Sequence, residues 1–355
     1  MAKKQITKGR KTVNKKSQLA TKKEVRKIAQ QVLNADVERK FMNAQSFTSL
    51  QPQPTQMVQE NGVWKPASRV SVLAFSNTVN QSGNGVIQTY GTTGDDSNDL
   101  PMYELEMTRP FQDTGNLGTK PYHIVGKEAK PVSAVNKWRI VRDISKLLKG
   151  EYLNHQSSGG SEQELVAPLE LTTSLPVICR MIRVSPKLNQ TANTVFPAVD
   201  LFLDTHSNII GVESGGFDDN EVLNYKINDR RYNVIQDKYF KIQNGLTVQW
   251  NRAVWSDGTN NSRAMVQPLI TNTNGNCEKS LTTSHQLTSR KNGTIHYNFP
   301  TNNPITATSG MRREYILFHF VYAGAETYLN SSSTINTCPT DLRVSNKNVV
   351  QFTDI

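Results

Sequence analysis

The stretch Tyr103-Glu104-Leu105-Glu106-Met107-Thr108 alternates apolar and polar side chains. Because successive side chains of a strand point to opposite faces, this period of two predicts a strand with one buried and one solvent-facing side. The same alternation recurs in two other segments: Leu165, Ala167, Leu169 and Leu171 against Glu164 and Glu170, and Val199, Leu201 and Leu203 against Asp200 and Asp204. The three segments favour a sheet protein over a helical one.

Seven further segments have the apolar, β-branched and aromatic content of strands. They are Val70–Phe75, Pro176–Val184, Tyr232–Ile242, Leu246–Trp250, Met265–Ile270, Glu314–Tyr322 and Val349–Thr353. Long polar stretches rich in Asn, Gly, Ser and Thr lie between them, as at 80–101, 206–230 and 256–263. About ten strands without a regular alternation of strands and helices predict an antiparallel sandwich or barrel.

One helix is expected within this β-rich body, at residues 137–149. Its apolar face would be Trp138, Val141, Ile144 and Leu148, and Gly150 supplies a stop signal. The cations of the same segment are Lys137, Arg139, Arg142, Lys146 and Lys149. Two interpretations stay open for this basic face: a surface directed at nucleic acid, or an ordinary solvated side of a helix.

The positive charge of the chain is concentrated at one end. The formal net charge is +11, and residues 1–40 hold 13 basic against three acidic residues, which is +10 and leaves +1 for the other 315. Such a segment binds phosphates through counterion release and does not read base sequence. We predict that nucleic acid is bound by Lys3, Lys4, Lys8, Arg10, Lys11, Lys15, Lys16, Lys22, Lys23, Arg26 and Lys27. The alternatives are a solubilising tail or a nuclear localisation signal.

The sequence divides into three parts. Residues 1–43 form the basic arm, in which a capping box at Thr21 and Glu24 and the helical spacing of Val25, Ile28 and Val32 predict an amphipathic helix over 22–41. Residues 44–68, rich in Gln and Pro, are expected to be a linker or extended arm. Residues 69–355 are expected to form the folded body.

Motifs for catalysis, cofactors and metals are absent from the sequence. The Gly115–Lys120 segment lacks the spacing of a phosphate-binding loop and precedes Pro121, and no G-x-S-x-G elbow occurs. The six histidines do not fall in metal-binding patterns, and Cys179, Cys277 and Cys338 are too scattered for a disulfide framework or a zinc site. We therefore expect no enzyme activity, cofactor or metal.

A calcium site and a membrane span are also not expected. Asp95, Asp96 and Asp99, or Asp218 with Asp219, could surround calcium, but turn chemistry explains them as well. The longest apolar run, 315–325, is too short to span a bilayer.

Aromatic residues stand beside cations in three segments, which is a pattern that can stack single-stranded bases. These segments are Arg230-Arg231-Tyr232, Lys238-Tyr239-Phe240-Lys241 and Trp250-Asn251-Arg252. Burial of the same aromatic rings in a core is the competing explanation.

The segment Asp229–Ile242 and the overall organisation resemble the capsid proteins of small circular single-stranded DNA viruses. In circovirus-like capsids a strand of the form basic, hydrophobic pair, x-Asp-Lys-x-aromatic lies in the middle of the fold, and Val234-Ile235-Gln236-Asp237-Lys238-Tyr239-Phe240 is similar to it. The length of the chain resembles the larger capsids of diatom-infecting DNA viruses. Those proteins in turn resemble nodavirus-like and tombusvirus-like RNA virus capsids, so the genome type stays open.

The resemblance implies an all-β single jelly roll, an eight-stranded antiparallel sandwich with long loops and a basic N-terminal arm that contains one amphipathic helix. It implies self-assembly into an icosahedral shell of sixty subunits or a multiple, with the arm directed inward onto packaged single-stranded DNA. The expected locations are the virion and, during assembly, the host nucleus, with nuclear import factors as possible partners. A non-viral nuclear β-barrel that binds single-stranded nucleic acid is the alternative from another class.

Overall fold

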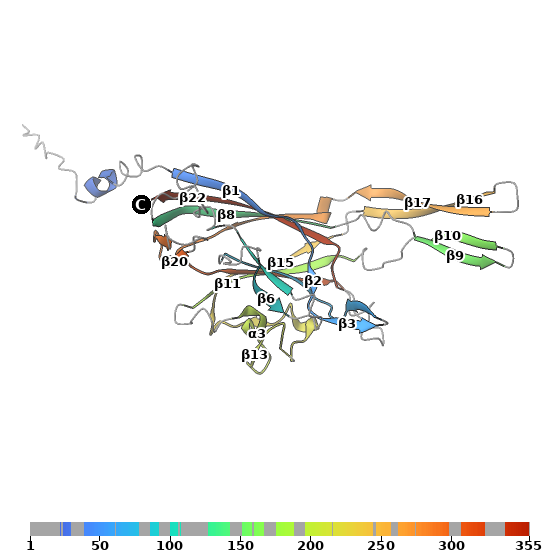
Figure 1. Ribbon diagram of the computed structural model, residues 1–355, viewed down its shortest axis with the longest axis horizontal. Coiled ribbons are helices and arrows are strands. Elements are labelled where there is room, and N and C mark those ends of the chain that lie inside the picture. Colours follow the sequence, from blue (N-terminus) through green and yellow to red (C-terminus); the bar gives the residue numbers. More distant parts are fainter. Residues whose placement is uncertain are drawn as a thin grey trace, which may run out of the picture.

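The computed structural model describes residues 22, 24–29, 39–60, 62–77, 86–91, 100–105, 107, 127–142, 151–157, 160–166, 175–187, 196–214, 216–243, 246–256, 262–273, 275–297, 307–323 and 338–354. These residues form mostly antiparallel β-sheet with few helices, which confirms the all-β class predicted from the sequence. Two large sheets make up the body (Figure 1).

The first sheet is fully antiparallel in its main part. Its strand order is β1 (Arg39–Leu50), β22 (Leu342–Asp354), β8 (Glu128–Arg142) and β18 (Glu278–Ser284). The short strands β19 (Ile295–Tyr297) and β20 (Ala307–Ser309) continue this sheet from the start of β8. The first sheet therefore joins the two ends of the folded chain, because β1 and β22 are neighbours.

The second sheet lies across from the first. Its main order is β15 (Tyr232–Ile242), β11 (Val177–Pro186), β21 (Tyr315–Tyr322) and β5 (Ser71–Ser76). Three shorter strands extend it at β5: β7 (Leu100–Glu104), which is parallel to β5, β6 (Val86–Gly91), and β2 (Gln53–Pro54).

The eight main strands pair in a nested order along the chain. Numbered by sequence, the first pairs with the eighth (β1 and β22), the second with the seventh (β5 and β21), the third with the sixth (β8 and β18) and the fourth with the fifth (β11 and β15). All four pairs are antiparallel. The chain is therefore arranged as one long hairpin folded over on itself. Its successive strand pairs lie alternately in the first and the second sheet.

An aromatic cluster fills the space between the two sheets. Phe75 of β5, Trp138 of β8 and Phe318 of β21 are almost fully buried. The ring centroid of Trp138 lies 4.9 Å from that of Phe75 and 5.1 Å from that of Phe318, and both contacts are edge-on. Such pairs add to the large apolar area that aromatic side chains bury. This contact fixes the central strand of the first sheet against the second sheet.

The strands β5, β11 and β21 of the second sheet are buried on both faces. Residues 196–231 cover its outer side with α3 (Pro197–Asp200), the small sheet β12 (Phe202–Leu203), β13 (Ile209–Ile210) and β14 (Lys226–Ile227), and the 3-10 turn η3 (Asp219–Glu221). Phe202 and Val222 of this layer belong to the same apolar cluster as Val72 and Leu317 of the sheet. Double burial explains why β5 and seven of the eight residues of β21 are buried.

Three hairpins lie outside the two large sheets. They are β3 (Met57–Glu60) with β4 (Val63–Pro66), β9 (Glu151–Ser157) with β10 (Gly160–Val166), and β16 (Leu246–Ser256) with β17 (Ser262–Thr273), the last followed by the turn η4 (Gly275–Cys277). Figure 1 shows the second and third hairpins projecting side by side from one end of the body, and β10 and β17 are in contact.

A buried carboxylate ties the two sheets together. Glu314, directly before β21, is 1% exposed and accepts a 2.7 Å hydrogen bond from Arg183 of β11. Its Oε1 lies 3.1 Å from Nδ1 of His285, which follows β18 in the first sheet. Its backbone N–H donates to the side chain of Asn77, at the end of β5. Arg183 also donates to the carbonyl of Ser284, so the cluster links four main strands.

The strand segments predicted from hydrophobic pattern differ in how well they match. Tyr232–Ile242 coincides with β15, and the segments at Val70, Pro176, Leu246, Met265, Glu314 and Val349 each fall on a strand. The prediction at 199–204 is wrong for Val199 and Asp200, which belong to the short helix α3. At 103–108, the strand β7 ends at Glu104, and the buried Leu105 and Met107 follow it.

Two helix predictions need correction. Residues 137–142 of the expected helix at 137–149 are strand β8, because each outward residue is followed by an inward one that packs between the sheets; residues 143–149 lie outside the described part. The expected helix at 22–41 is helical at 22 and 24–29, but Arg39–Phe41 are extended and pair with β22. Much of the expected linker at 44–68 is strand, from β1 to β4.

We predict that Glu314→Gln lowers the free energy of unfolding by about 3 kcal/mol, because Arg183 remains buried without its counter-charge. Burial raises the pKa of this carboxyl, but the hydrogen bond and charge of His285 and the charge of Arg183 outweigh burial and hold it below its ordinary value of 4.5. The carboxylate's contribution is therefore complete above pH 4.5 and is lost as the pH falls through the lower folded-state pKa.

Urea unfolding at neutral and acidic pH measures both effects. Glu221→Gln is the matched control, because Glu221 is exposed. Equal stability of the Glu314→Gln variant and the control at neutral pH would contradict the prediction.

Candidate nucleic-acid interface

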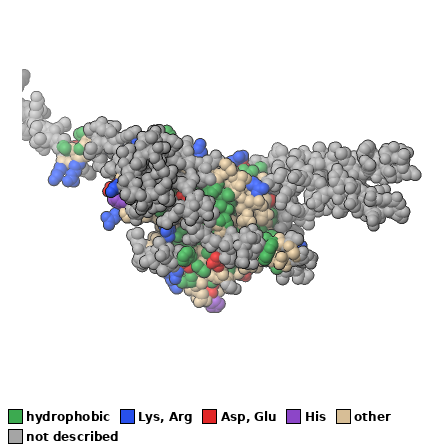
Figure 2. All heavy atoms as spheres, in the orientation of Figure 1, with side chains coloured by type: hydrophobic (Ala, Val, Ile, Leu, Met, Phe, Trp, Pro, Cys, Tyr) green, Lys and Arg blue, Asp and Glu red, His purple; other side chains and the backbone are tan. Residues whose placement is uncertain are grey.

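The structure describes three of the eleven arm residues predicted to bind nucleic acid. Lys22, Arg26 and Lys27 belong to the N-terminal helical segment, and all three are exposed. Figure 2 shows Lys and Arg side chains gathered on this segment, beyond the end of the body. The other eight residues lie outside the described part of the chain: Lys3, Lys4, Lys8, Arg10, Lys11, Lys15, Lys16 and Lys23.

The helical segment also presents apolar side chains to solvent. Val25 is 53% exposed and Ile28 is 55% exposed. They are three residues apart and so lie on one side of the helix, whereas Lys22 and Arg26 are four residues apart and share another. The segment is therefore amphipathic as predicted, and its apolar side is not covered by the described part of this chain.

The arm joins the body at the edge of the first sheet. Arg39 and Lys40 begin β1, opposite Thr353 and Phe352 at the end of β22. Figure 1 shows the helical segment and the C-terminus at the same end of this sheet. The pairing of β1 with β22 thus fixes the point from which the cationic arm leaves.

The cationic side chains at 137–142 lie on both faces of strand β8, because successive side chains of a strand point to opposite faces. Lys137 and Arg139 are exposed on the outward face of the first sheet, whereas Asn136, Trp138 and Ile140 are buried. Arg142 points inward and forms an ion pair with Asp341 just before β22. The expected basic surface therefore contains Lys137 and Arg139, but not Arg142. Lys146 and Lys149 lie outside the described residues.

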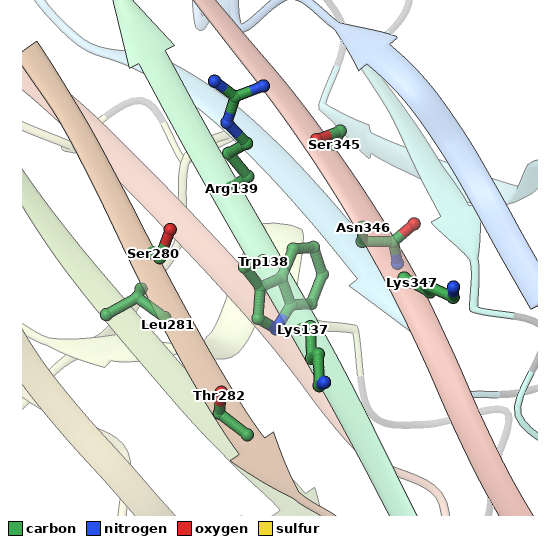
Figure 3. A pocket seen from close by; sticks show the side chains of 9 residues that line it. All are labelled: Lys137, Trp138, Arg139, Ser280, Leu281, Thr282, Ser345, Asn346 and Lys347. Atoms are coloured by element: carbon green, nitrogen blue, oxygen red, sulfur yellow. The ribbon is translucent and has the colours of Figure 1, made fainter.

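The outward face of the first sheet has an open hollow of about 280 Å³ (Figure 3). Three strands line it: β8 in the middle, with β18 and β22 on its two sides. The lining residues are Lys137, Trp138, Arg139, Ser280, Leu281, Thr282, Ser345, Asn346 and Lys347. The contribution of β22 could not be found from the sequence, because Lys347 is far from Lys137 along the chain and only strand pairing makes them neighbours.

Two of the three aromatic and cation segments are described with side chains, and both serve the fold. Tyr232 is buried and donates a hydrogen bond to Asp200, which also pairs with Arg231. Tyr239 is 51% exposed, but its hydroxyl donates to the carbonyl of Leu223 at 2.7 Å.

A buried arginine also contacts the ring of Tyr239. The guanidinium of Arg180 lies 5.4 Å from that ring's centroid and 5.5 Å from the ring of Phe202. It also forms an ion pair with Asp237. Tyr239 and Arg180 thus anchor the layer at 196–231 to the sheet. The side chains at Trp250 and Arg252 lie outside the described part.

The Asp218 and Asp219 pair has structural partners. The carboxylate of Asp219 accepts hydrogen bonds from the backbone of Arg69 and the hydroxyl of Thr55, and the carboxylate of Asp218 accepts from the backbone of Asn220. Burial raises the pKa of Asp219 to about 6. Asp95, Asp96 and Asp99 lie outside the described residues. Within the described ranges, no three His, Cys, Asp or Glu side chains gather as metal ligands would.

No protein-family model matches the sequence, and a search of curated proteins finds no match. Among the described elements, no helix has the length and apolarity needed to cross a membrane.

We predict that Tyr239→Leu changes the affinity for single-stranded DNA by about twofold or less, whereas loss of a stacked base would cost about 1–3 kcal/mol. The reason is that the tyrosine is already engaged by Arg180 and Leu223. Fluorescence anisotropy with a labelled oligodeoxythymidine measures the affinity, and circular dichroism checks folding. A large loss of affinity in a folded variant would show that the ring stacks on bases.

Proposed function

We propose that this protein is a viral capsid protein that assembles into an icosahedral shell and packages a single-stranded genome with its cationic arm. The observation that carries the proposal is the attachment of a strongly basic segment to the edge of a nearly neutral, nested β-sandwich. This combination separates two tasks, since the body can form a wall while the arm neutralises phosphate.

The nested strand pairing supports a jelly roll as the fold of the body. In a jelly roll, a long antiparallel hairpin of eight strands is wrapped into two four-stranded sheets. The four pairs of this chain, from β1 with β22 to β11 with β15, follow that order. Successive pairs belong alternately to the first and the second sheet, as in a jelly roll. The remaining described strands, the helix α3 and the turns η3 and η4 are insertions between the eight, and the helical segment of the arm precedes β1.

Exposed apolar side chains support self-assembly. Strand β15 is the edge of the second sheet, and its Val234 and Ile235 are 45% and 37% exposed. Long edge strands with apolar residues tend to be covered by another element or another chain. Val25 and Ile28 in the arm need a similar cover. Contacts with identical subunits would bury these positions around symmetry axes.

The charge distribution supports packaging of nucleic acid. A nearly neutral body limits repulsion between neighbouring copies, and the arm supplies cations that contact phosphates without base preference. Single-stranded DNA is preferred over RNA because of the resemblance of Val234–Phe240 to circovirus-like capsids. The virion and the host nucleus are the corresponding locations, with nuclear import factors as further partners of the arm.

The first experiment is to express the full chain, separate it by size-exclusion chromatography and image the leading peak by negative-stain electron microscopy. Spherical particles with high absorbance at 260 nm relative to 280 nm are expected, and sequencing their nucleic acid distinguishes DNA from RNA. A clean monomer across salt and pH would favour a non-viral binding module instead.

We predict that deletion of residues 1–23 leaves a folded body but removes most of the packaged nucleic acid. The deletion removes nine cations and no acidic residue, and it ends before the described body begins at Arg39. Circular dichroism checks the fold, and the ratio of absorbances at 260 and 280 nm measures nucleic-acid content. Full packaging by the truncated chain would refute the role of the arm.

We also predict that the affinity of the full-length protein for single-stranded DNA falls steeply with salt and differs little between base sequences. Each neutralised phosphate of a single strand contributes a slope of about −0.7 in log K against log salt. Titrations with homopolymers and mixed sequences over a salt series measure both properties. A salt-insensitive affinity would indicate base readout instead.

A further inference from the structure

We propose that the outward face of the first sheet is a second phosphate-binding site for nucleic acid, centred on Lys137 and Lys347. This inference rests on the proposed packaging function and extends it from the arm to the wall of the sandwich. Its evidence is a set of described side chains on β8, β18 and β22, all in regular strand register.

The cations and hydroxyls of this face form two consecutive rows across the three strands. In one row Lys137 lies between Thr282 and Lys347, and in the next Arg139 lies between Ser280 and Ser345. Rows on one face of a sheet are about 6.6 Å apart, because side chains on the same face are two residues apart. Lys, Arg and hydroxyl side chains are the groups that usually contact phosphates. The spacing is comparable to that of adjacent phosphates in an extended single strand.

The two lysines are like charges placed directly opposite each other. Such cross-strand pairs are destabilising in a sheet unless an anion compensates them. Within the described part of the chain, neither ammonium group has a hydrogen bond or an ion pair. An anion bound between them would remove the repulsion, so the arrangement favours a ligand with negative charge.

An acidic residue on the same face, Glu278 of β18, is already engaged. Glu278 lies one row beyond Arg139 and accepts two hydrogen bonds from its guanidinium, at 2.7 and 2.8 Å. The hydrogen bond from Arg139, together with the charge of its guanidinium, holds the pKa of Glu278 below its usual range against the opposing effect of burial. Glu278 therefore neutralises Arg139 and leaves the charge of Lys137 and Lys347 uncompensated.

The central strand of the site, β8, is anchored in the core by Trp138. Trp138, between the two cations, packs against Phe75 and Phe318, and its Nε1–H donates to Thr283 of β18 at 3.1 Å. The hollow of about 280 Å³ over these strands is open (Figure 3). In contrast, residues 196–231 cover the outer side of the strands β5, β11 and β21 of the second sheet.

The arm makes nucleic acid the favoured occupant. Arg39 lies opposite Thr353, six residues from Lys347 along β22, which is about 20 Å of strand. The 38 residues before Arg39 can reach several times that distance when extended. A strand held by the arm is therefore present at high effective concentration over this face. An acidic protein segment has no such link to the site.

The test compares two double variants of the full-length protein. Lys137→Gln with Lys347→Gln removes the proposed site, and Lys238→Gln with Lys241→Gln removes two exposed lysines from β15 in the second sheet. Both lower the net charge equally. Protein freed of nucleic acid is titrated with a labelled oligodeoxythymidine over a salt series, and the salt slope of the first variant should become shallower by about 1.4. The control should keep the slope of the unmodified protein.

A single variant separates binding from folding. Lys347→Glu places opposite charges across β8 and β22, so the melting temperature should stay the same or rise while the affinity falls. Loss of affinity together with a lowered melting temperature would overturn the inference, because it would point to damage in the sheet. Equal slopes for the two double variants would overturn it as well.

Two other outcomes show whether the proposed function or only the further inference is wrong. If the unmodified protein shows no salt-dependent binding, the proposed function itself fails. If the Lys137→Gln and Lys347→Gln double variant binds oligodeoxythymidine as the unmodified protein does but no longer binds a polyglutamate probe, the face takes an acidic protein segment. In that case the inference fails, while the proposed function stands.

Discussion

The buried carboxylate of Glu314 is the constraint on which the arrangement of the two sheets depends. A charge that is 1% exposed is stable only when it is paired and hydrogen bonded, and its partners Arg183 and His285 come from different sheets. The directional bonds of this cluster therefore specify how β11, β18 and β21 sit relative to one another. Apolar packing around Phe75, Trp138 and Phe318 supplies contact area, but it is less directional.

The two sheets differ in what covers them, and this difference decides where chemistry can occur. The strands β5, β11 and β21 of the second sheet are buried on both faces because the layer at 196–231 packs on their outer side. Strand β8 of the first sheet alternates buried and exposed residues, and Lys137 and Arg139 lie on the outward face of this sheet. The basic arm joins the edge of the same sheet, where Arg39 and Lys40 begin β1.

The pairing of the first and last main strands has a further consequence. With β1 and β22 adjacent, the arm and the C-terminus emerge at one end of the first sheet, while the β9–β10 and β16–β17 hairpins project from the body elsewhere (Figure 1). In the proposed shell, this arrangement allows one end of the subunit to contact the packaged strand and other surfaces to contact neighbouring copies. The nearly neutral charge of residues 41–355 suits such close packing.

The sequence by itself determined the all-β class, the basic arm and the positions of strands such as Tyr232–Ile242 and Glu314–Tyr322. These features depend on local composition and on a hydrophobic period that neighbouring residues are enough to reveal. The helix expected at 137–149 is wrong at 137–142: Trp138 and Val141 fit a period of 3.6, but the inward residues of the strand are Ala134, Trp138 and Ile140, and the polar Asn136 between them hides their period of two.

Only the tertiary structure decided between the two periods, through hydrogen bonding of β8 to β18 and β22, each well over a hundred residues away. The same pairing placed Lys137 opposite Lys347 and turned Arg142 inward to Asp341. No local pattern encodes these neighbours, because partners in a sheet are chosen by packing over the whole chain.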